Sequence, residues 1–221
     1  DFKGLERALM ELRGLDEAQA GREVARLLES NCSTYDLYSQ LQELCAPRLL
    51  VDKSPSYPLS RPALRRAEVW FRKPLYIHLV RHPLPCIRSW TACNFDQVLY
   101  GPPRQAAEMD WLLSNENILE HLSGVESTRR TLIRYEDILS SPAEQMARLC
   151  NFLGLDYEES LIDPYQGQRM TERLSGLVSG DKMFYKKSSI DASALQGARR
   201  LAEDGPITDE TREMAQSFGY E

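Results

Sequence analysis

The stretch PLYIHLVRHPLPCIRSW, residues 74–90, holds an apolar run that ends abruptly at Arg81-His82-Pro83 and continues as a helical pattern. The near-continuous apolar run LYIHLV, residues 75–80, predicts a strand covered on both faces, as in a parallel sheet between helices. Pro83 falls in the first turn of the predicted helix, where its missing N–H costs nothing. The stretch therefore predicts an α/β fold with Arg81 at the carboxyl end of a buried strand.

Two further segments have the pattern of strands. RTLIRYEDIL, residues 130–139, predicts a second strand that ends in Tyr135-Glu136-Asp137, where Asp137 orders the turn into the next helix. RLLVDKSPSYP, residues 48–58, begins with an apolar run that predicts a brief strand, and its Ser-Pro turn cannot continue that strand. Together with the first strand, these segments predict a short parallel sheet flanked by helices.

Helical periodicity covers most of the remaining sequence. The predicted helices are two or three within residues 2–44 and one each over residues 62–71, 83–99, 104–122, 142–153, 192–202 and 208–218. Ser141 is the candidate N-cap of the helix over 142–153, Glu144 is placed for a capping box, and Gly154 is its natural stop. The polar, glycine-bearing stretch from Gly167 to Ser189 is typical of a functional loop.

Composition restricts the class of protein. The 221 residues, of which 42% are hydrophobic, suit one sizeable core and allow one domain or at most two small ones; we predict a single domain over residues 1–221. A formal net charge of −6 argues against nucleic acid as a partner, so any anion has to be held locally. The five cysteines have no metal-ligand spacing, which indicates reduced core residues of a cytosolic, cytoplasmic protein and no metal site. No apolar stretch is long enough to span a membrane.

Arg81 is a candidate anion-binding residue. Ligands of open parallel sheets collect at the carboxyl ends of the strands, where a following helix points its unpaired N–H groups at them. A guanidinium can bind a phosphate bidentately, and the hydroxyl of Ser89, one to two helical turns later, could bind the same anion. The alternative is that Arg81 is a solvated strand end or one half of an ion pair.

Two other strand ends carry candidate site residues. Lys53 follows the short apolar run at 49–51, and the sheet topology could bring its ammonium near the same crevice to neutralise charge on a leaving oxygen. Tyr135 could offer an aromatic face to a base. The alternatives are an exposed loop lysine and a structural tyrosine. The glycines form neither a Walker A motif nor the dinucleotide-binding G-x-G-x-x-G motif, which disfavours a kinase, an ATPase or a dinucleotide enzyme.

Three ordered motifs carry a family resemblance: RLLVDKSPSY, YIHLVRHPLPCIRSW and LIRYEDILSSPAEQMARLCNFLGL. Their order and separation resemble those of sulfotransferases that use 3′-phosphoadenosine 5′-phosphosulfate (PAPS) and release adenosine 3′,5′-bisphosphate. The stretches DPYQGQRMTERL and KKSSID extend the resemblance to sulfotransferase domains of bacterial polyketide and olefin synthases. The resemblance implies a P-loop-NTPase-like sulfotransferase fold.

The resemblance also implies roles for individual residues. Arg81 and Ser89 would bind the 3′-phosphate of PAPS, and Tyr135 would lie against the adenine. Lys53 would stabilise the bridging oxygen between the sulfuryl group and the 5′-phosphate. Lys187 resembles a basic residue that closes over the nucleotide.

The sequence departs from the family in one respect. The first strand, the loop for the 5′-phosphosulfate, the following helix and a carboxylate base are all expected before Asp1. Cytosolic sulfotransferases instead carry a histidine base two residues after the matching lysine, where this sequence has Pro55. The chain is interpreted either as a fragment of a longer polypeptide that supplies the loop or as a remnant that has lost it.

These features lead to two main hypotheses. The first is a PAPS-dependent sulfotransferase domain that transfers a sulfuryl group to the β-hydroxyl of an acyl chain on an acyl carrier protein, with neighbouring synthase domains as further partners. The second is a catalytically inactive sulfotransferase-like domain with a structural or docking role in a multidomain synthase. A glycan or small-alcohol acceptor is a third possibility, which the acidic balance does not favour.

Overall fold

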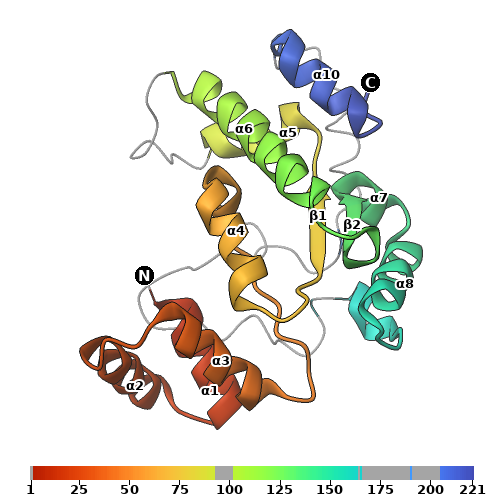
Figure 1. Cartoon of the computed structure of the whole chain (residues 1–221). Coiled ribbons are helices and arrows are strands. Elements are labelled where there is room, and N and C mark those ends of the chain that lie inside the picture. The colour runs from red at the N-terminus through yellow and green to blue at the C-terminus, as the bar shows by residue number, and fades with distance from the viewer. Residues whose placement is uncertain (1, 93–101, 164, 166–189, 191–204) are drawn as a thin grey trace. The chain divides into compact units, whose positions relative to one another are not determined.

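The computed structural model describes residues 2–92, 102–163, 165, 190 and 205–221 (Figure 1). Contacts within the chain divide it into a first unit, residues 1–53 with 165–188, and a second unit, residues 54–164 with 189–221. Each unit contains a hydrophobic core of its own. The single domain over residues 1–221 stays a prediction.

The described part of the first unit is helical, as its periodicity predicted. Its helices are α1 (Lys3–Arg13), α2 (Glu17–Glu29) and α3 (Thr34–Cys45). Asp16 caps α2 through a capping box, in which its carboxylate accepts from the Gln19 N–H at 2.7 Å and the Gln19 side chain accepts from the Asp16 N–H at 2.9 Å. The apolar stripes of the three helices meet in a core formed by Leu9, Ala20, Val24, Leu27 and Leu41.

The brief strand predicted at 49–51 is wrong, because these residues form a loop. Val51 is 74% exposed and Leu49 is 48% exposed, while Leu50 packs against the helical core. Three apolar residues without a hydrogen-bonded neighbour cannot form a ladder, and here only Leu50 is needed for packing. The loop is tied to α3 by the Tyr38 hydroxyl, which donates to the Asp52 carboxylate at 2.6 Å.

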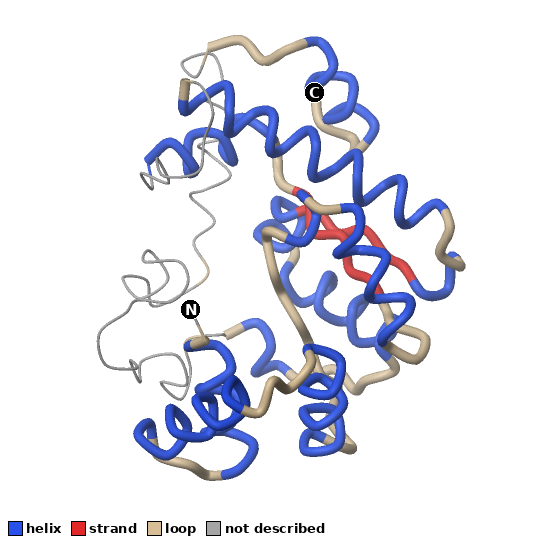
Figure 2. The backbone as a smooth tube through the Cα atoms, turned by 60° about the vertical axis from the view of Figure 1, so that its left-hand side comes forward, coloured by secondary structure: helices blue, strands red, loops and turns tan. Residues whose placement is uncertain are grey.

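The second unit contains a parallel pair of strands, β1 (Tyr76–Val80) and β2 (Arg130–Arg134). The strands are red in Figure 2, and their register runs from Tyr76 opposite Arg130 to Val80 opposite Arg134. The connection between them includes α5 (Pro83–Ala92), α6 (Pro103–Ser123) and the short η2 (Ser127–Arg129). A crossover of this length is what a parallel pair requires.

Further helices complete the described part of the second unit. They are η1 (Tyr57–Leu59), α4 (Arg61–Trp70), α7 (Tyr135–Ser140), α8 (Pro142–Leu153), η3 (Glu159–Ile162) and α10 (Asp209–Ser217). These bounds confirm the helices predicted at 62–71, 142–153 and 208–218. The helix predicted at 192–202 lies outside the described residues.

Of the two predicted ends of α8, the stop at Gly154 is confirmed and the cap at Ser141 is wrong. Gly154 ends the helix in the left-handed conformation, with φ +69°, as predicted. The side-chain cap at Ser141 is wrong, because its hydroxyl makes no capping hydrogen bond. Ser141 also terminates α7, with its N–H donating to the Asp137 carbonyl at 2.9 Å. The backbone of Ser141, with φ −144° and ψ 62°, is not in the extended conformation that is typical of a capping residue.

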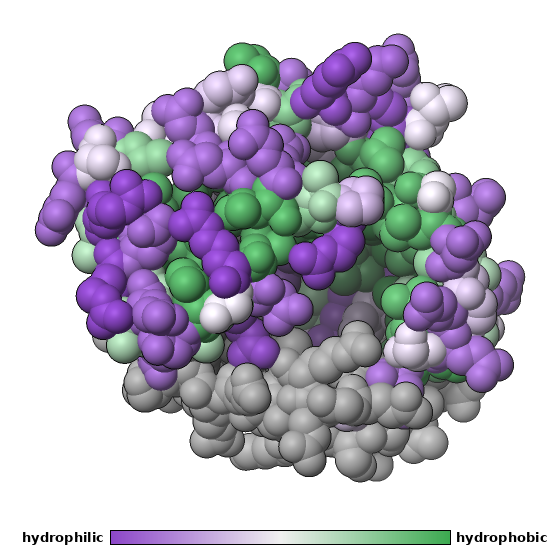
Figure 3. Space-filling view, turned by 90° about the horizontal axis from the view of Figure 1, so that it is seen from below, coloured by the Kyte–Doolittle hydropathy of each residue, from purple (hydrophilic) through white to green (hydrophobic). Residues whose placement is uncertain are grey.

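Within the described residues β1 is buried on one face only, whereas Ile133 of β2, which lies opposite the exposed Leu79, is 1% exposed. His78 and Val80 are buried against α6 and the segment after α10, which contribute Trp111 and Phe218. On the other face Leu79 is 56% exposed, so the prediction of a strand covered on both faces is wrong for this part of the chain. Apolar residues also lie among hydrophilic ones on the surface that Figure 3 displays.

A membrane-spanning helix is not found: none of the described helices combines the necessary length and apolar character. The same residues contain no group of three or more His, Cys, Asp or Glu side chains that could hold a metal ion.

Candidate functional site

The carboxyl ends of the two strands bring Arg81 and Tyr135 together. Because Val80 lies opposite Arg134, the next residue of each chain segment is its neighbour across the sheet edge. The guanidinium carbon of Arg81 lies 4.7 Å from the centroid of the Tyr135 ring. The second strand was predicted to extend through YED, but it ends at Arg134 and Tyr135 begins α7. The side chain of Tyr135 therefore lies at the sheet edge and not within the ladder.

Arg81 is half-buried, and no carboxylate among the described residues pairs with its guanidinium. Its stacking on Tyr135 holds the charged group by a cation–π contact that leaves its N–H donors available. The described residues therefore do not support the alternative that Arg81 is one half of an ion pair. A positive group with free donors at the carboxyl edge of a parallel sheet can bind an anion.

The N-terminus of α5 offers fewer free N–H groups for binding an anion than the sequence suggested. Pro83 and Pro85 have no N–H, and the Leu84 N–H donates to the ring Nδ1 of His82 at 3.2 Å. The Cys86 N–H already belongs to the helix, donating to the His82 carbonyl at 3.3 Å. The expectation of unpaired N–H groups in this turn is therefore wrong, and anion binding here depends on side chains.

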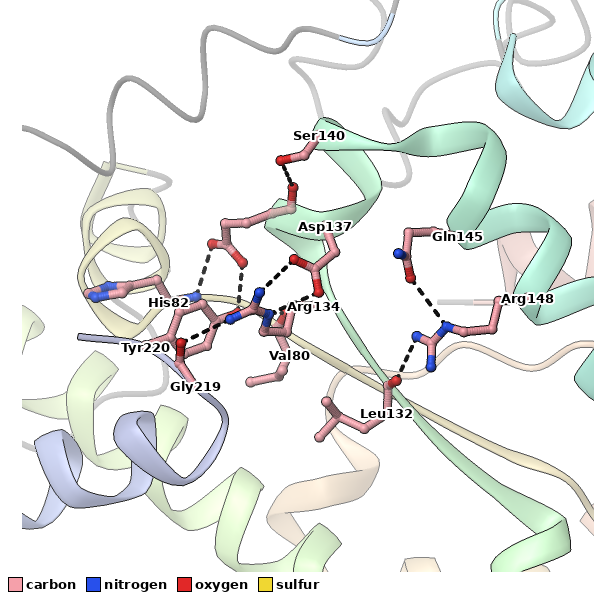
Figure 4. Close-up of polar contacts among 11 residues, drawn as sticks. Val80, His82, Leu132, Arg134, Asp137, Ser140, Gln145, Arg148, Gly219 and Tyr220 are labelled. Carbon is pink, nitrogen blue, oxygen red and sulfur yellow. Dashed lines mark hydrogen bonds and ion pairs between the residues drawn. The ribbon is translucent and has the colours of Figure 1, made fainter.

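Glu136 and Tyr220 support the turn that carries Arg81 and His82, and Figure 4 shows Tyr220 beside His82. The Glu136 carboxylate accepts from the His82 N–H at 3.1 Å through one oxygen and from the Tyr220 hydroxyl at 2.7 Å through the other. The Tyr220 hydroxyl also lies 3.4 Å from the Val80 carbonyl. Trp111 holds the other side of the turn, with its indole N–H donating to the Arg81 carbonyl at 3.0 Å.

Arg134 makes a separate, closed pair at the same edge (Figure 4). Its guanidinium binds both carboxylate oxygens of Asp137, at 2.9 and 2.7 Å, and donates to the Gly219 carbonyl at 2.9 Å. The hydrogen bonds from Arg134 lower the pKa of Asp137. This pair orders the start of α7, as was predicted for Asp137, and its cation is not available to a ligand.

Two titratable groups beside the site keep their protons at neutral pH. Burial raises the pKa of the Cys86 thiol to about 11, although the charge of Arg81 acts in the opposite direction. Burial and the hydrogen bond to Glu136 raise the pKa of Tyr220 well above its ordinary value. Cys86 is therefore not a thiolate nucleophile, and Tyr220 acts as a hydrogen-bond donor.

The other predicted site residues are less closely tied to Arg81. Ser89 lies exposed on α5, and Lys53 lies exposed in the loop of the first unit. Because Lys53 belongs to the other unit, its place beside the nucleotide stays a prediction. Lys187 lies outside the described residues.

Trp111, Glu136 and Tyr220 are the residues that sequence reasoning missed. Glu136 was noted only as part of the YED motif, and Trp111 and Tyr220 lie within ordinary amphipathic or terminal patterns. Tyr220 is 140 residues from Val80, so no local period could connect the two. Only the packing of α10 and its following segment against β1 reveals the contact.

Comparisons with known proteins agree with the resemblance in the motifs. The family model described as "Sulfotransferase family" matches residues 2–159. The solved structure titled "Sulfotransferase Domain from the Curacin Biosynthetic Pathway" is 37% identical, with a TM-score of 0.92 over 99% of this chain and 79% of that chain. A second, titled "Sulfotransferase Domain from the Synechococcus PCC 7002 Olefin Synthase", is 35% identical, with a TM-score of 0.90 over 99% of this chain and 76% of that chain.

No curated protein matches the sequence. The family match nevertheless covers well over half of the 221 residues and includes the strand ends that carry Arg81 and Tyr135. Both solved structures share the fold and more than a third of the residues. The chain therefore belongs to the sulfotransferase family.

Proposed function

We propose that this chain is the PAPS-dependent sulfotransferase domain of a multidomain synthase, and that Arg81 binds the 3′-phosphate of PAPS. The supporting observation is the guanidinium of Arg81, which is half-buried, stacked on Tyr135 and free of a carboxylate partner among the described residues. A phosphate would satisfy its fork of donors bidentately. Because α5 offers no free N–H in its first turn, Arg81 would carry most of the binding energy of that phosphate.

The neighbouring residues suit the other parts of the nucleotide. Tyr135 presents an aromatic ring beside Arg81, where an adenine could stack. Ser89 would add a hydroxyl to the 3′-phosphate from α5, and Lys187 would close over the nucleotide. These roles are carried over from the family motif.

PAPS supplies the activated sulfuryl group, and its transfer builds negative charge on the leaving 5′-phosphate oxygen. In this proposal Lys53 places an ammonium against that oxygen, an electrostatic role that needs positioning and no proton transfer. The loop for the 5′-phosphosulfate and the carboxylate base would come from polypeptide that precedes Asp1.

The acceptor that we propose is the β-hydroxyl of an acyl chain carried by an acyl carrier protein. The support is similarity to two sulfotransferase domains, one from a biosynthetic pathway and one from an olefin synthase. The acidic balance of the chain, with a net charge of −6, gives no support to a strongly anionic acceptor such as a glycan.

Calorimetric titration with adenosine 3′,5′-bisphosphate tests the nucleotide site. Hydrogen bonds to a charged group contribute about 1.5–3 kcal/mol, so Arg81→Ala should weaken binding about 10- to 150-fold. The matched control is Arg130→Ala, which removes the same charge from an exposed residue at the opposite end of the sheet. The control should bind like the wild-type protein. Absence of wild-type binding, or equal binding by Arg81→Ala, would refute the nucleotide site.

A transfer assay tests the reaction separately from binding. The chain together with the polypeptide proposed to precede Asp1, PAPS and a β-hydroxyacyl carrier protein should yield the sulfated acyl chain, detected by mass spectrometry, and Lys53→Ala should abolish this product without abolishing nucleotide binding. Nucleotide binding without transfer would instead favour the catalytically inactive domain.

A further inference from the structure

The peptide bond between Arg81 and His82 is held by side chains on both of its polar groups. Its carbonyl accepts from the Trp111 indole at 3.0 Å, and its N–H donates to the Glu136 carboxylate at 3.1 Å. Rotation of this peptide would break one or both hydrogen bonds. Since the Arg81 side chain leaves the backbone next to this peptide, the two contacts restrict the direction in which the guanidinium points.

Glu136 is not used as an ion-pair partner. Its two carboxylate oxygens accept from a backbone N–H and a tyrosine hydroxyl, and no Lys or Arg among the described residues makes a salt bridge with it. Charge-assisted hydrogen bonds of this kind are short and directional. A carboxylate bound in this way orients the two groups that donate to it. It forms no ion pair with the nearby guanidinium of Arg81 and so does not neutralise that charge by direct contact.

Tyr220 fixes Glu136 from the segment that follows α10. The Tyr220 residue is 9% exposed, its ring packs edge to face on the His82 ring at 5.2 Å, and the Arg134 guanidinium lies 5.5 Å from its centroid. The Gly219 carbonyl accepts from Arg134 at 2.9 Å and anchors the same segment. The hydroxyl is thereby held where it donates to Glu136.

We propose that Glu136 and Tyr220 are positioning residues of the 3′-phosphate site, which act by holding the Arg81–His82 peptide in the orientation that presents the Arg81 guanidinium. The inference rests on the proposed nucleotide site. It assigns the segment around residues 218–220, far from the three family motifs, to the binding of the phosphate. Neither residue touches the nucleotide in this proposal.

Removal of the hydroxyl or the carboxylate tests the proposal. Adenosine 3′,5′-bisphosphate and 5′-AMP, which lacks the 3′-phosphate, are titrated calorimetrically into the wild-type, Tyr220→Phe, Glu136→Gln and Glu136→Ala proteins. Because positioning errors weaken only contacts made by the misplaced group, affinity for the bisphosphate should fall about 5-fold in Tyr220→Phe and about 10-fold or more in Glu136→Ala. Glu136→Gln keeps one acceptor oxygen and should fall between the wild-type protein and Glu136→Ala. Affinity for 5′-AMP should change less than about twofold.

Tyr76→Phe is the matched control. The Tyr76 hydroxyl also donates to a glutamate, Glu68, at 2.7 Å, but it lies at the opposite end of β1. This variant loses the same kind of hydrogen bond and should keep both affinities. The indole N–H resonance of Trp111 in NMR spectra should shift in Tyr220→Phe and stay in place in Tyr76→Phe.

The outcomes separate this inference from the function on which it rests. Failure of the wild-type protein to bind the bisphosphate would overturn the proposed nucleotide site and the inference with it. Wild-type binding that Tyr220→Phe and Glu136→Ala retain in full would overturn the inference alone. Equal losses for the bisphosphate and 5′-AMP would show a general structural role and would also overturn it.

Discussion

Both ends of the two-stranded sheet carry a tyrosine hydroxyl that donates to a glutamate at 2.7 Å. At the amino end the acceptor is Glu68, which also receives both arms of the Arg129 guanidinium, at 3.0 and 2.9 Å. The hydrogen bonds from Arg129 lower the pKa of Glu68. Arg129 also donates to the Pro74 carbonyl at 3.0 Å. At the amino end Glu68 and Arg129 therefore neutralise each other.

At the carboxyl end the corresponding glutamate has only neutral donors among the residues that the structure describes. Glu136 is bound by a backbone N–H and a hydroxyl, while the nearby Arg81 stacks on Tyr135. Arg134 is already bound to Asp137. The comparison teaches that the two glutamates differ in their partners: Glu68 neutralises a neighbouring arginine, whereas Glu136 binds neutral donors and leaves Arg81 available at the end proposed to bind a ligand.

A large effect, within the range expected for Arg81→Ala, is expected at Tyr135, whose ring is proposed to stack against the adenine. Tyr135→Ala should weaken binding of 5′-AMP by about 2 kcal/mol or 30-fold, because stacking of a base on an aromatic ring contributes about 1–3 kcal/mol. Binding of adenosine 3′,5′-bisphosphate should weaken by at least as much, because the Tyr135 ring also holds the Arg81 guanidinium. Arg81→Ala should weaken binding of the bisphosphate alone. Calorimetry with both nucleotides would show whether the two residues bind different parts of one ligand. A loss restricted to the bisphosphate in Tyr135→Ala would contradict the stacking role.

A smaller effect is expected from Glu68→Gln at the amino end. This substitution removes the charge that faces Arg129, and for a pair that is partly exposed the loss in unfolding free energy should be about 1 kcal/mol. Urea denaturation measures this loss, and nucleotide titration should give wild-type affinities. Weakened nucleotide binding in Glu68→Gln would contradict the separation of the two ends. Glu136→Gln, the same substitution at the carboxyl end, provides the contrast.

The smallest effect is expected from pH. Burial lowers the pKa of His78 in β1 and of His121, whose ring packs on Tyr76 at 5.1 Å. Because the folded pKa lies below the unfolded value of about 6.5, the unfolded chain takes up protons first as the pH falls. Stability should therefore be complete above that value and decline as the pH falls toward the lowered pKa values. Urea midpoints measured between pH 8 and pH 5 would show this decline.

His121→Phe provides the control for the amino end. This variant keeps the ring contact with Tyr76 and loses the titratable group. It also removes a buried Nε2 that has no hydrogen-bond partner among the described residues. The decline with falling pH should be shallower than in the wild-type protein, with no loss of stability at pH 8. A decline of unchanged slope would assign the pH dependence to groups other than His121.

Local sequence patterns predicted most of the described helices and both strands of the sheet, because an apolar period is a property of neighbouring residues. The errors occurred where a residue has two roles or lacks a partner. Ser141 serves two helices, the run at 49–51 has no neighbouring strand in the described part of the chain, and the prolines of α5 remove the N–H groups expected there. Each of these three errors arose because the outcome depends on the structure around the segment and not on its own residues.

The sequence by itself determined where a strand would end in a bare arginine and, through three ordered motifs, which family the chain belongs to. Tertiary structure alone decided that Arg81 stacks on Tyr135 and that Tyr220 reaches Glu136. The physical reason is distance along the chain: periodicity reports which face of an element is apolar, whereas contacts between residues 54 or 84 positions apart arise only when separate elements pack.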